Sequence, residues 1–201
     1  MLRRTLTRLF PPRPVVATRE DLEDFLRTRA AFVSQKAMYE YCRARAGVMW
    51  DKLMLEEAFV AELERGRWQA FAAALSDLAV VAELVLRQHS RDGAHVPVLA
   101  ASAARVLAGE PRLRAWGVDA AAVEAEIRLR LAEAAANPPR KVYQISERAG
   151  GRIFALLPIH PSVRRADEAM VVNSVRFLMI RAYEELAAAK RGLAAAMMQG
   201  R

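Results

Sequence analysis

The chain has 201 residues, of which 54% are hydrophobic and 27% charged, a composition typical of a globular protein and not of a disordered one. A single cysteine, Cys42, excludes an intrachain disulfide, so we expect a cytoplasmic protein. The net charge is +8, but most arginines alternate with glutamates along predicted helices, which is typical of a solvated surface. We therefore do not expect a nucleic acid as the partner.

The first ten residues, MLRRTLTRLF, form a basic amphipathic segment. On a helical wheel its apolar and basic residues take opposite sides: Leu2, Leu6, Leu9 and Phe10 against Arg3, Arg4 and Arg8. This pattern favours contact with an anionic membrane surface or a protein partner. It is also typical of an organelle presequence and of a loose tail. A proline-rich spacer follows, so we divide the chain into a tail over residues 1–17 and one α-helical domain over residues 18–201.

Helical periodicity dominates the first half of the domain. Thr18 is a predicted N-cap, and apolar spacing continues from there to a stop at Gly47. A second helix is predicted over residues 50–65, with Gly66 as an interruption. The segment 67–89 is apolar on two faces, which predicts a central helix surrounded by others.

The second half contains shorter helices and one ambiguous stretch. Helices are predicted over residues 98–108 and, after an Asp119 cap, over 119–136, with a linker between them. Residues 142–157 fit a helix broken at Gly150-Gly151, and they also fit a short β-hairpin with a Gly-Gly turn. We favour the helix. The last helix is predicted from Ser162 to Met198, with Met170 and Phe177 among its inward residues. The fold class is therefore an all-α, single-domain bundle of six or seven helices, with long first and last helices.

One carboxylate interrupts the apolar face of the central helix. Asp77 lies between alanine and valine positions, and a carboxylate there needs a partner or a proton. Three polar residues interrupt the last helix in the same way, which predicts a buried polar cluster of Asp77, Asn173, Arg176 and Arg181. The main interpretation is an ion pair that fixes the register of two helices. An acid with a raised pKa in a pocket, or an Asp77 that reaches solvent, are the alternatives.

Aromatic residues concentrate in the first three predicted helices. At helical spacing they are core residues by default, but a loosely filled core would make them the lining of an apolar ligand pocket. The candidate lining residues are Tyr39, Trp50, Trp68 and Phe71. The sequence does not separate the two interpretations.

Catalytic and metal-binding motifs are missing from the sequence. The chain has no GxSxG, no HExxH and no Glu-x-x-His, and its three histidines, His89, His95 and His160, lack the spacing of a zinc site. We expect no cofactor and no metal. The leading hypothesis is a non-enzymatic interaction protein, an adaptor or assembly-type factor, peripheral to an anionic membrane through its N-terminal segment. The alternatives are a helical pocket protein for an apolar small molecule, and a nucleic-acid-binding protein.

Overall fold

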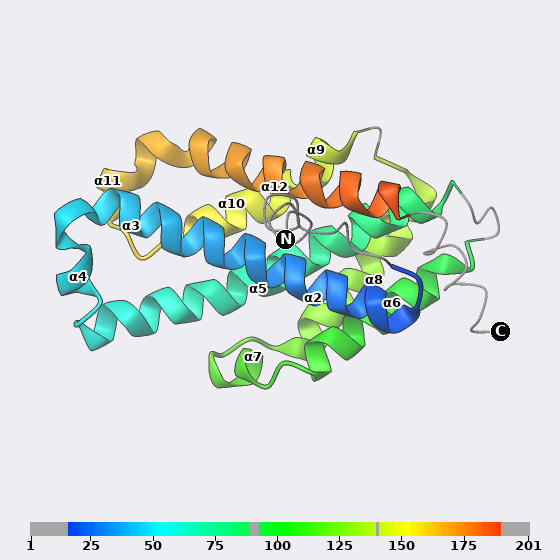
Figure 1. The fold of residues 1–201 in the computed structure, drawn as a ribbon, viewed down its shortest axis with the longest axis horizontal. Helices are drawn as coiled ribbons and strands as arrows, with labels where there is room; N and C mark the ends of the chain where they lie inside the picture. Colours follow the sequence, from blue (N-terminus) through cyan, green and yellow to red (C-terminus); the bar gives the residue numbers. More distant parts are fainter. Residues whose placement is uncertain (1–15, 89–92, 140, 190–201) are drawn as a thin grey trace, which may run out of the picture.

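The computed structural model describes residues 16–88, 93–139 and 141–189, and within these ranges the chain forms helices and turns but no strand. The all-α bundle predicted from the sequence is confirmed (Figure 1). The elements, in chain order, are α2 (Arg19–Gln35), η1 (Lys36–Glu40), α3 (Tyr41–Ala46), η2 (Gly47–Met49), α4 (Trp50–Leu53), α5 (Glu57–Leu86), α6 (His95–Ala108), α7 (Arg112–Ala115), α8 (Ala120–Ala136), α9 (Val142–Ile145), α10 (Glu147–Leu156), α11 (Pro161–Arg164), η3 (Arg165–Asp167) and α12 (Glu168–Ala188).

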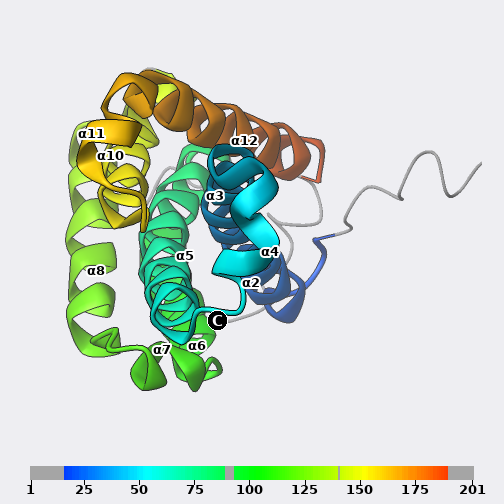
Figure 2. The same cartoon turned by 90° about the vertical axis from the view of Figure 1, so that its left-hand side faces the viewer.

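Helix α5 is the centre of the bundle. It contacts α2, α6, α8, α10 and α12, which surround it in the end-on view of Figure 2. Over its second half, most side chains are buried because both of its apolar faces have a neighbouring helix. By length and composition α5 could cross a membrane, but 89% of its most apolar window is buried inside the bundle, which is the environment of a core helix.

Gly66 does not interrupt the central helix, contrary to the sequence prediction, and α5 runs through it from Glu57 to Leu86. A Cβ added at Gly66 would lie 2.6 Å from Met38 Cε and 2.8 Å from the backbone oxygen of Leu156. The glycine therefore allows α10 and η1 to approach the helix closely, and its helix-breaking tendency is overridden by this packing.

The predicted helix caps are confirmed, whereas the predicted breaks inside helices are not. Thr18 and Asp21 form a reciprocal capping box at the start of α2, and the Asp119 side chain accepts hydrogen bonds from two backbone N–H groups of α8. Between residues 142 and 157 the chain is helical, so the hairpin alternative is wrong. The break lies at Ser146, and Gly150-Gly151 lies inside α10.

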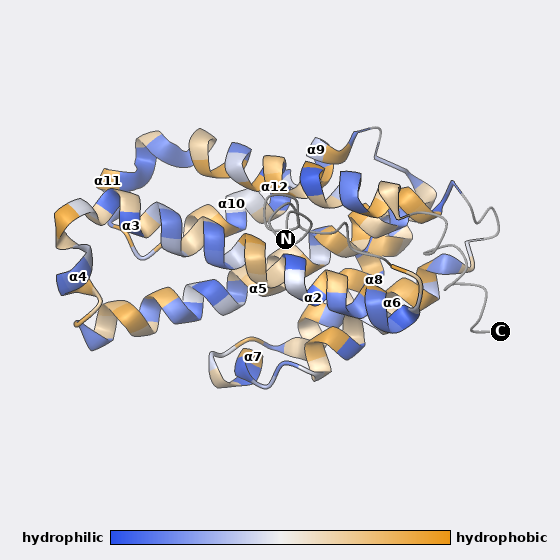
Figure 3. Cartoon of the chain, in the orientation of Figure 1, coloured by the Kyte–Doolittle hydropathy of each residue, from blue (hydrophilic) through white to orange (hydrophobic). Residues whose placement is uncertain are grey.

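The first and last long helices lie antiparallel. Tyr41 and Arg45, at the end of the α2–η1–α3 run, contact Asp167 just before α12, whereas Arg29 in α2 pairs with Glu185 near the end of α12. The start of α2 and the end of α12 therefore lie at the same end of the bundle (Figure 1). The hydropathy view shows polar and apolar turns alternating along both helices, as expected where one side faces solvent (Figure 3).

Candidate functional site

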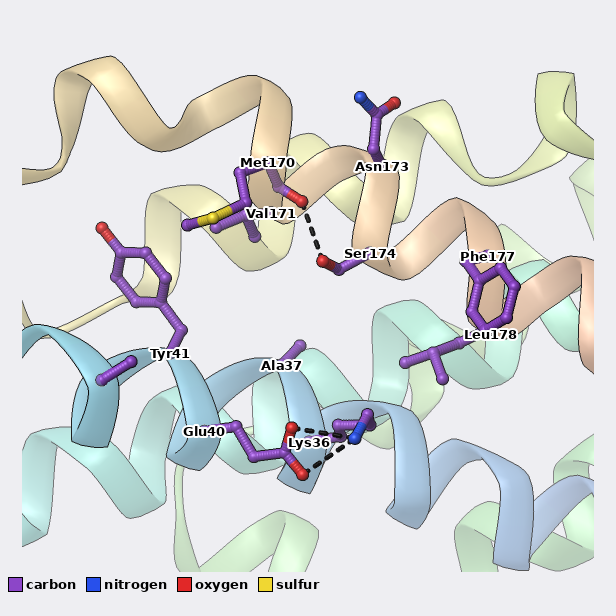
Figure 4. A pocket seen from close by; sticks show the side chains of 11 residues that line it. Lys36, Ala37, Glu40, Tyr41, Met170, Val171, Asn173, Ser174, Phe177 and Leu178 are labelled. Atoms are coloured by element: carbon purple, nitrogen blue, oxygen red, sulfur yellow. Dashed lines mark hydrogen bonds and ion pairs between the residues drawn. The ribbon is translucent and has the colours of Figure 1, made fainter.

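An apolar groove separates α12 from the η1–α3 segment. Its volume is about 570 Å³, and Figure 4 shows its two walls. One wall contains Ala37, Tyr41 and Ala44, and the other contains residues from Met170 to Leu178. Met170 and Phe177 are predicted as inward residues, but they are 54% and 62% exposed and line this groove.

Polar contacts also join α12 to the α2–η1–α3 run on either side of the groove. On one side Tyr41 Oη donates to Asp167 Oδ2 at 2.7 Å, and Arg45 pairs with the same carboxylate. The hydrogen bonds from Arg45 and Tyr41 lower the pKa of Asp167, which keeps this contact ionised. On the other side the Arg29–Glu185 ion pair, at 2.6 Å, joins α2 to α12.

The groove is lined by a π-helix, η1, which joins α2 to α3. Such a turn widens the helix, and π-turns are frequent at functional sites. Between Lys36 and Ala44 the groove runs over eight residues, about 12 Å of helix. A groove of this length can accept one or two large apolar side chains. Among its polar groups, Lys36 pairs with Glu40, and the Ser174 hydroxyl donates to the Met170 carbonyl.

The buried carboxylate of Asp77 has an arginine partner, but not one from the last helix. Asp77 is fully buried, and its Oδ1 lies 2.6 Å from Arg130 Nη1 of α8. The same Nη1 donates to Ser76 Oγ at 2.7 Å. Burial raises the pKa of Asp77 to about 6, against the opposing effect of the Arg130 charge.

The predicted cluster of Asp77, Asn173, Arg176 and Arg181 is not brought together. Arg176 donates to Asn173 and to Glu147 of α10, and Arg181 pairs with Glu184 within α12. The charged partner of Asp77 comes from α8. Arg130 escapes the sequence analysis because it follows an alternation of glutamate and arginine typical of a solvent-exposed helix.

A second buried acid, Glu83, lies further along α5. Its carboxylate is bound by Arg87 and lies 3.3 Å from His95 Nε2 of α6. Burial acts to raise the pKa of Glu83, but the hydrogen bonds from His95 and Arg87 outweigh it and hold the pKa below its usual range. The two buried acids of the central helix therefore link α5 to neighbouring helices, Asp77 to α8 and Glu83 to α6.

The four predicted pocket aromatics do not share a cavity. Tyr39 packs edge-on to Trp50, and Trp68 packs on Phe71 as a separate pair. None of them lines the groove, or either of two further cavities of about 410 and 520 Å³ beside α5. They contribute to the core, or pack against it.

Reactive side chains are sparse in the part of the chain that the structure describes. Cys42 is buried, and burial raises its pKa to about 12, so its thiol stays protonated. His160 caps α11 by accepting from the backbone N–H of Ser162. No group of three or more potential metal ligands occurs among the described residues. His89 lies outside them, and so do Leu2, Arg3, Arg4, Leu6, Arg8, Leu9 and Phe10.

Comparison of the chain with protein-family models, with curated proteins and with solved structures gives no match. The function is therefore inferred from the molecule itself.

Proposed function

We propose that the protein is a non-enzymatic interaction protein, an adaptor or assembly-type factor, held at an anionic membrane surface by its N-terminal segment. The observation that carries the proposal is the distribution of charge. Residues 16–88, 93–139 and 141–189 contain 22 basic and 22 acidic side chains, so this part of the chain has no net charge. The whole excess of +8 belongs to the remaining residues.

Half of that excess belongs to residues 1–15, which contain four arginines and no acid. A neutral bundle has no long-range attraction for an anionic surface, whereas a basic segment with apolar side chains has both electrostatic and hydrophobic attraction. The alternation of leucine with arginine favours a lipid surface over a nucleic acid. Binding to nucleic-acid phosphates uses the basic side chains and does not require an apolar side on the segment.

The groove between α12 and η1–α3 supports the interaction part of the proposal. Its exposed Met170 and Phe177 side chains make it a suitable receptor for a helix that presents one or two large apolar residues. The alternative of an apolar ligand pocket has less support, because Asp77, its expected polar end, lines none of the three cavities described above.

Vesicle co-sedimentation tests the membrane proposal. The full chain is compared with an Arg3→Gln, Arg4→Gln, Arg8→Gln variant on anionic and on neutral vesicles. We expect the full chain to bind anionic vesicles only, and the variant to bind them far more weakly. Equal binding by both proteins, or no binding by either, would contradict the proposal.

A further inference from the structure

The groove between α12 and η1–α3 belongs to a wider apolar face of the bundle. Phe32 of α2 and Phe177 of α12, both exposed, are joined on this face by Lys36. The Lys36 Nζ lies 5.9 Å from the centre of the Phe32 ring, and the Lys36 side chain lines the groove together with Phe177 and the exposed Met170. We call this surface, made of Phe32, Lys36, Met170, Ser174 and Phe177, the groove face. It presents large apolar side chains beside a recess.

The groove face is complementary to itself. Met170 and Phe177 lie toward opposite ends of the groove with Ser174 between them, about 10 Å apart along α12 (Figure 4). If a two-fold axis passes near Ser174, two antiparallel copies of α12 place Phe177 of each copy over Met170 and the groove of the other. A two-fold interface uses the same patch twice, so the patch must contain both a projecting side chain and a recess that receives it. The groove face contains both.

The charges on and beside the groove face are balanced. Lys36 pairs with Glu40, and further along α12 Arg181 pairs with Glu184. A nucleic acid or a strongly charged peptide gains little from such a surface, because neither sign of charge is in excess. A second copy carries the same balanced pairs and meets no net repulsion from them. The charge pattern therefore favours a second copy of this chain as the occupant of the groove.

The groove face is large enough for a dimer interface. Helix α12 has 21 residues, which is about 31 Å of helix, and two adjacent helices are about 20 Å wide. The face therefore measures about 600 Å² in flat projection, and its accessible area is larger because side chains project from it. A standard interface buries about 800 Å² on each partner, so one such face provides the area that a stable dimer needs.

We propose that the occupant of the groove is α12 of a second copy of this chain, in a two-fold dimer that seats Phe177 of each copy in the groove of the other. The inference rests on the interaction role in the proposed function and names the partner for it. It does not depend on the membrane contact of the N-terminal segment.

Sedimentation equilibrium of the full chain without lipid tests the dimer. We expect the unmodified chain to dimerise, and Phe177→Glu to dimerise at least about thirtyfold more weakly, as is typical when a central aromatic contact is lost. Leu129→Glu is the matched control, because Leu129 of α8 is as exposed as Phe177 and lies outside the groove. This control should dimerise like the unmodified chain, and circular dichroism verifies that both variants are folded.

A mixing experiment tests the pairing of Phe177 with Met170. Phe177→Glu and Met170→Lys should each self-associate weakly, whereas an equimolar mixture of the two should form a tighter dimer than either variant alone. In the mixed dimer the introduced carboxylate meets the introduced amine at one contact, and the other contact keeps the original Phe177 and Met170 side chains. If mixing gives no gain in affinity, the proposed pairing is wrong.

The salt dependence separates this dimer from other associations. Each copy has a net charge of +8, so salt screens the repulsion between copies and should tighten the dimer between about 0.05 and 0.5 M sodium chloride. Association that weakens with salt indicates a charge-driven contact, and association beyond two copies indicates a head-to-tail contact, so either overturns the inference. A chain that stays monomeric up to about 0.2 mM at both salt concentrations also overturns it, and this result leaves the vesicle-binding proposal to its own test.

Discussion

Asp77 of α5 and Arg130 of α8 form an ion pair in the interior of the bundle, 2.6 Å from Oδ1 to Nη1. The aspartate is fully buried and the arginine 8% exposed, so neither charge has solvent as an alternative partner. This pair fixes the position of α8 along α5.

Removal of only one partner should destabilise the protein strongly. Asp77→Leu leaves the Arg130 guanidinium buried without a counter-charge, and we expect a loss of about 3–5 kcal/mol in the free energy of unfolding. Asp77→Leu combined with Arg130→Met removes both charges and should recover most of that loss. Urea denaturation of both variants measures the difference. A loss below about 1 kcal/mol in the single variant would sink the idea that the pair is structurally required.

The pH dependence of stability should report the raised pKa of Asp77. The folded carboxyl has a pKa of about 6, against 3.8 for the ordinary group, so protonation stabilises the folded protein. This contribution is fully present below pH 4 and is lost as the pH rises through 6. Asp77→Asn cannot titrate, so its stability relative to the unmodified protein should increase by about 3 kcal/mol from pH 4 to pH 7. If the difference in unfolding free energy between Asp77→Asn and the unmodified protein stays constant over this range, the pKa of Asp77 is not raised.

Glu83 should give the opposite pH dependence. Its pKa is lowered in the folded state, so the ionised form contributes stability that is present above its ordinary pKa and lost as the pH falls below it. In Glu83→Gln this acid-dependent loss should disappear, so the difference in unfolding free energy between variant and unmodified protein should narrow on acidification. Thermal unfolding at a series of pH values between 3 and 6 tests this. If the difference in unfolding free energy widens at low pH instead, the assignment of a lowered pKa to Glu83 is wrong.

Two glycines should respond with opposite signs to the same substitution. Gly66→Ala places a methyl group 2.8 Å from the Leu156 backbone oxygen, and we expect a destabilisation of about 1–3 kcal/mol. Gly151, inside α10, has nothing within 4 Å of an added Cβ, so Gly151→Ala should stabilise the helix by about 0.5–1 kcal/mol. Chemical denaturation measures the free energy of unfolding of both variants, and each variant is the control for the other. Stabilisation by both would indicate that α10 can move away from Gly66.

The groove should bind an apolar probe through its exposed side chains. Met170→Gln with Phe177→Gln should reduce the fluorescence of bound 1-anilinonaphthalene-8-sulfonate, with little change in stability because both residues are more than half exposed. Leu129→Gln is the matched control, since Leu129 on α8 is 61% exposed and lies outside the groove. If Leu129→Gln reduces the signal as much as the groove variant does, the dye does not report the groove.

The sequence predicts the elements of this fold better than it predicts their partners. Periodicity and caps locate the starts of α2 and α8, and periodicity marks the apolar half of α5 as helix, because these signals are local. The breaks assigned to Gly66 and to Gly150-Gly151 are wrong because tertiary packing decides whether a glycine ends a helix. The partner of Asp77 depends on which helix packs against its side chain, and local sequence patterns do not show this. Arg130 belongs to a pattern typical of an exposed helix, so the sequence does not predict it as that partner.

The groove cannot be predicted from local sequence patterns for the same reason. Met170 and Phe177 belong to an apolar stripe on α12 that is wider than one neighbour can cover. The facing η1–α3 segment leaves part of that stripe open as the groove. A helical wheel marks both side chains as core, and the assembled fold exposes them.

The neutrality of the bundle also has a consequence for how molecules meet one another. In free solution residues 1–15 and 190–201, with seven of the eight excess positive charges, supply most of the like-charge repulsion between copies of this protein, since the bundle has no net charge to add. Neutralisation of those segments by an anionic surface would remove that repulsion where the protein is concentrated. Dense lateral packing of neighbouring bundles on the surface is then limited by their shape and no longer by their charge.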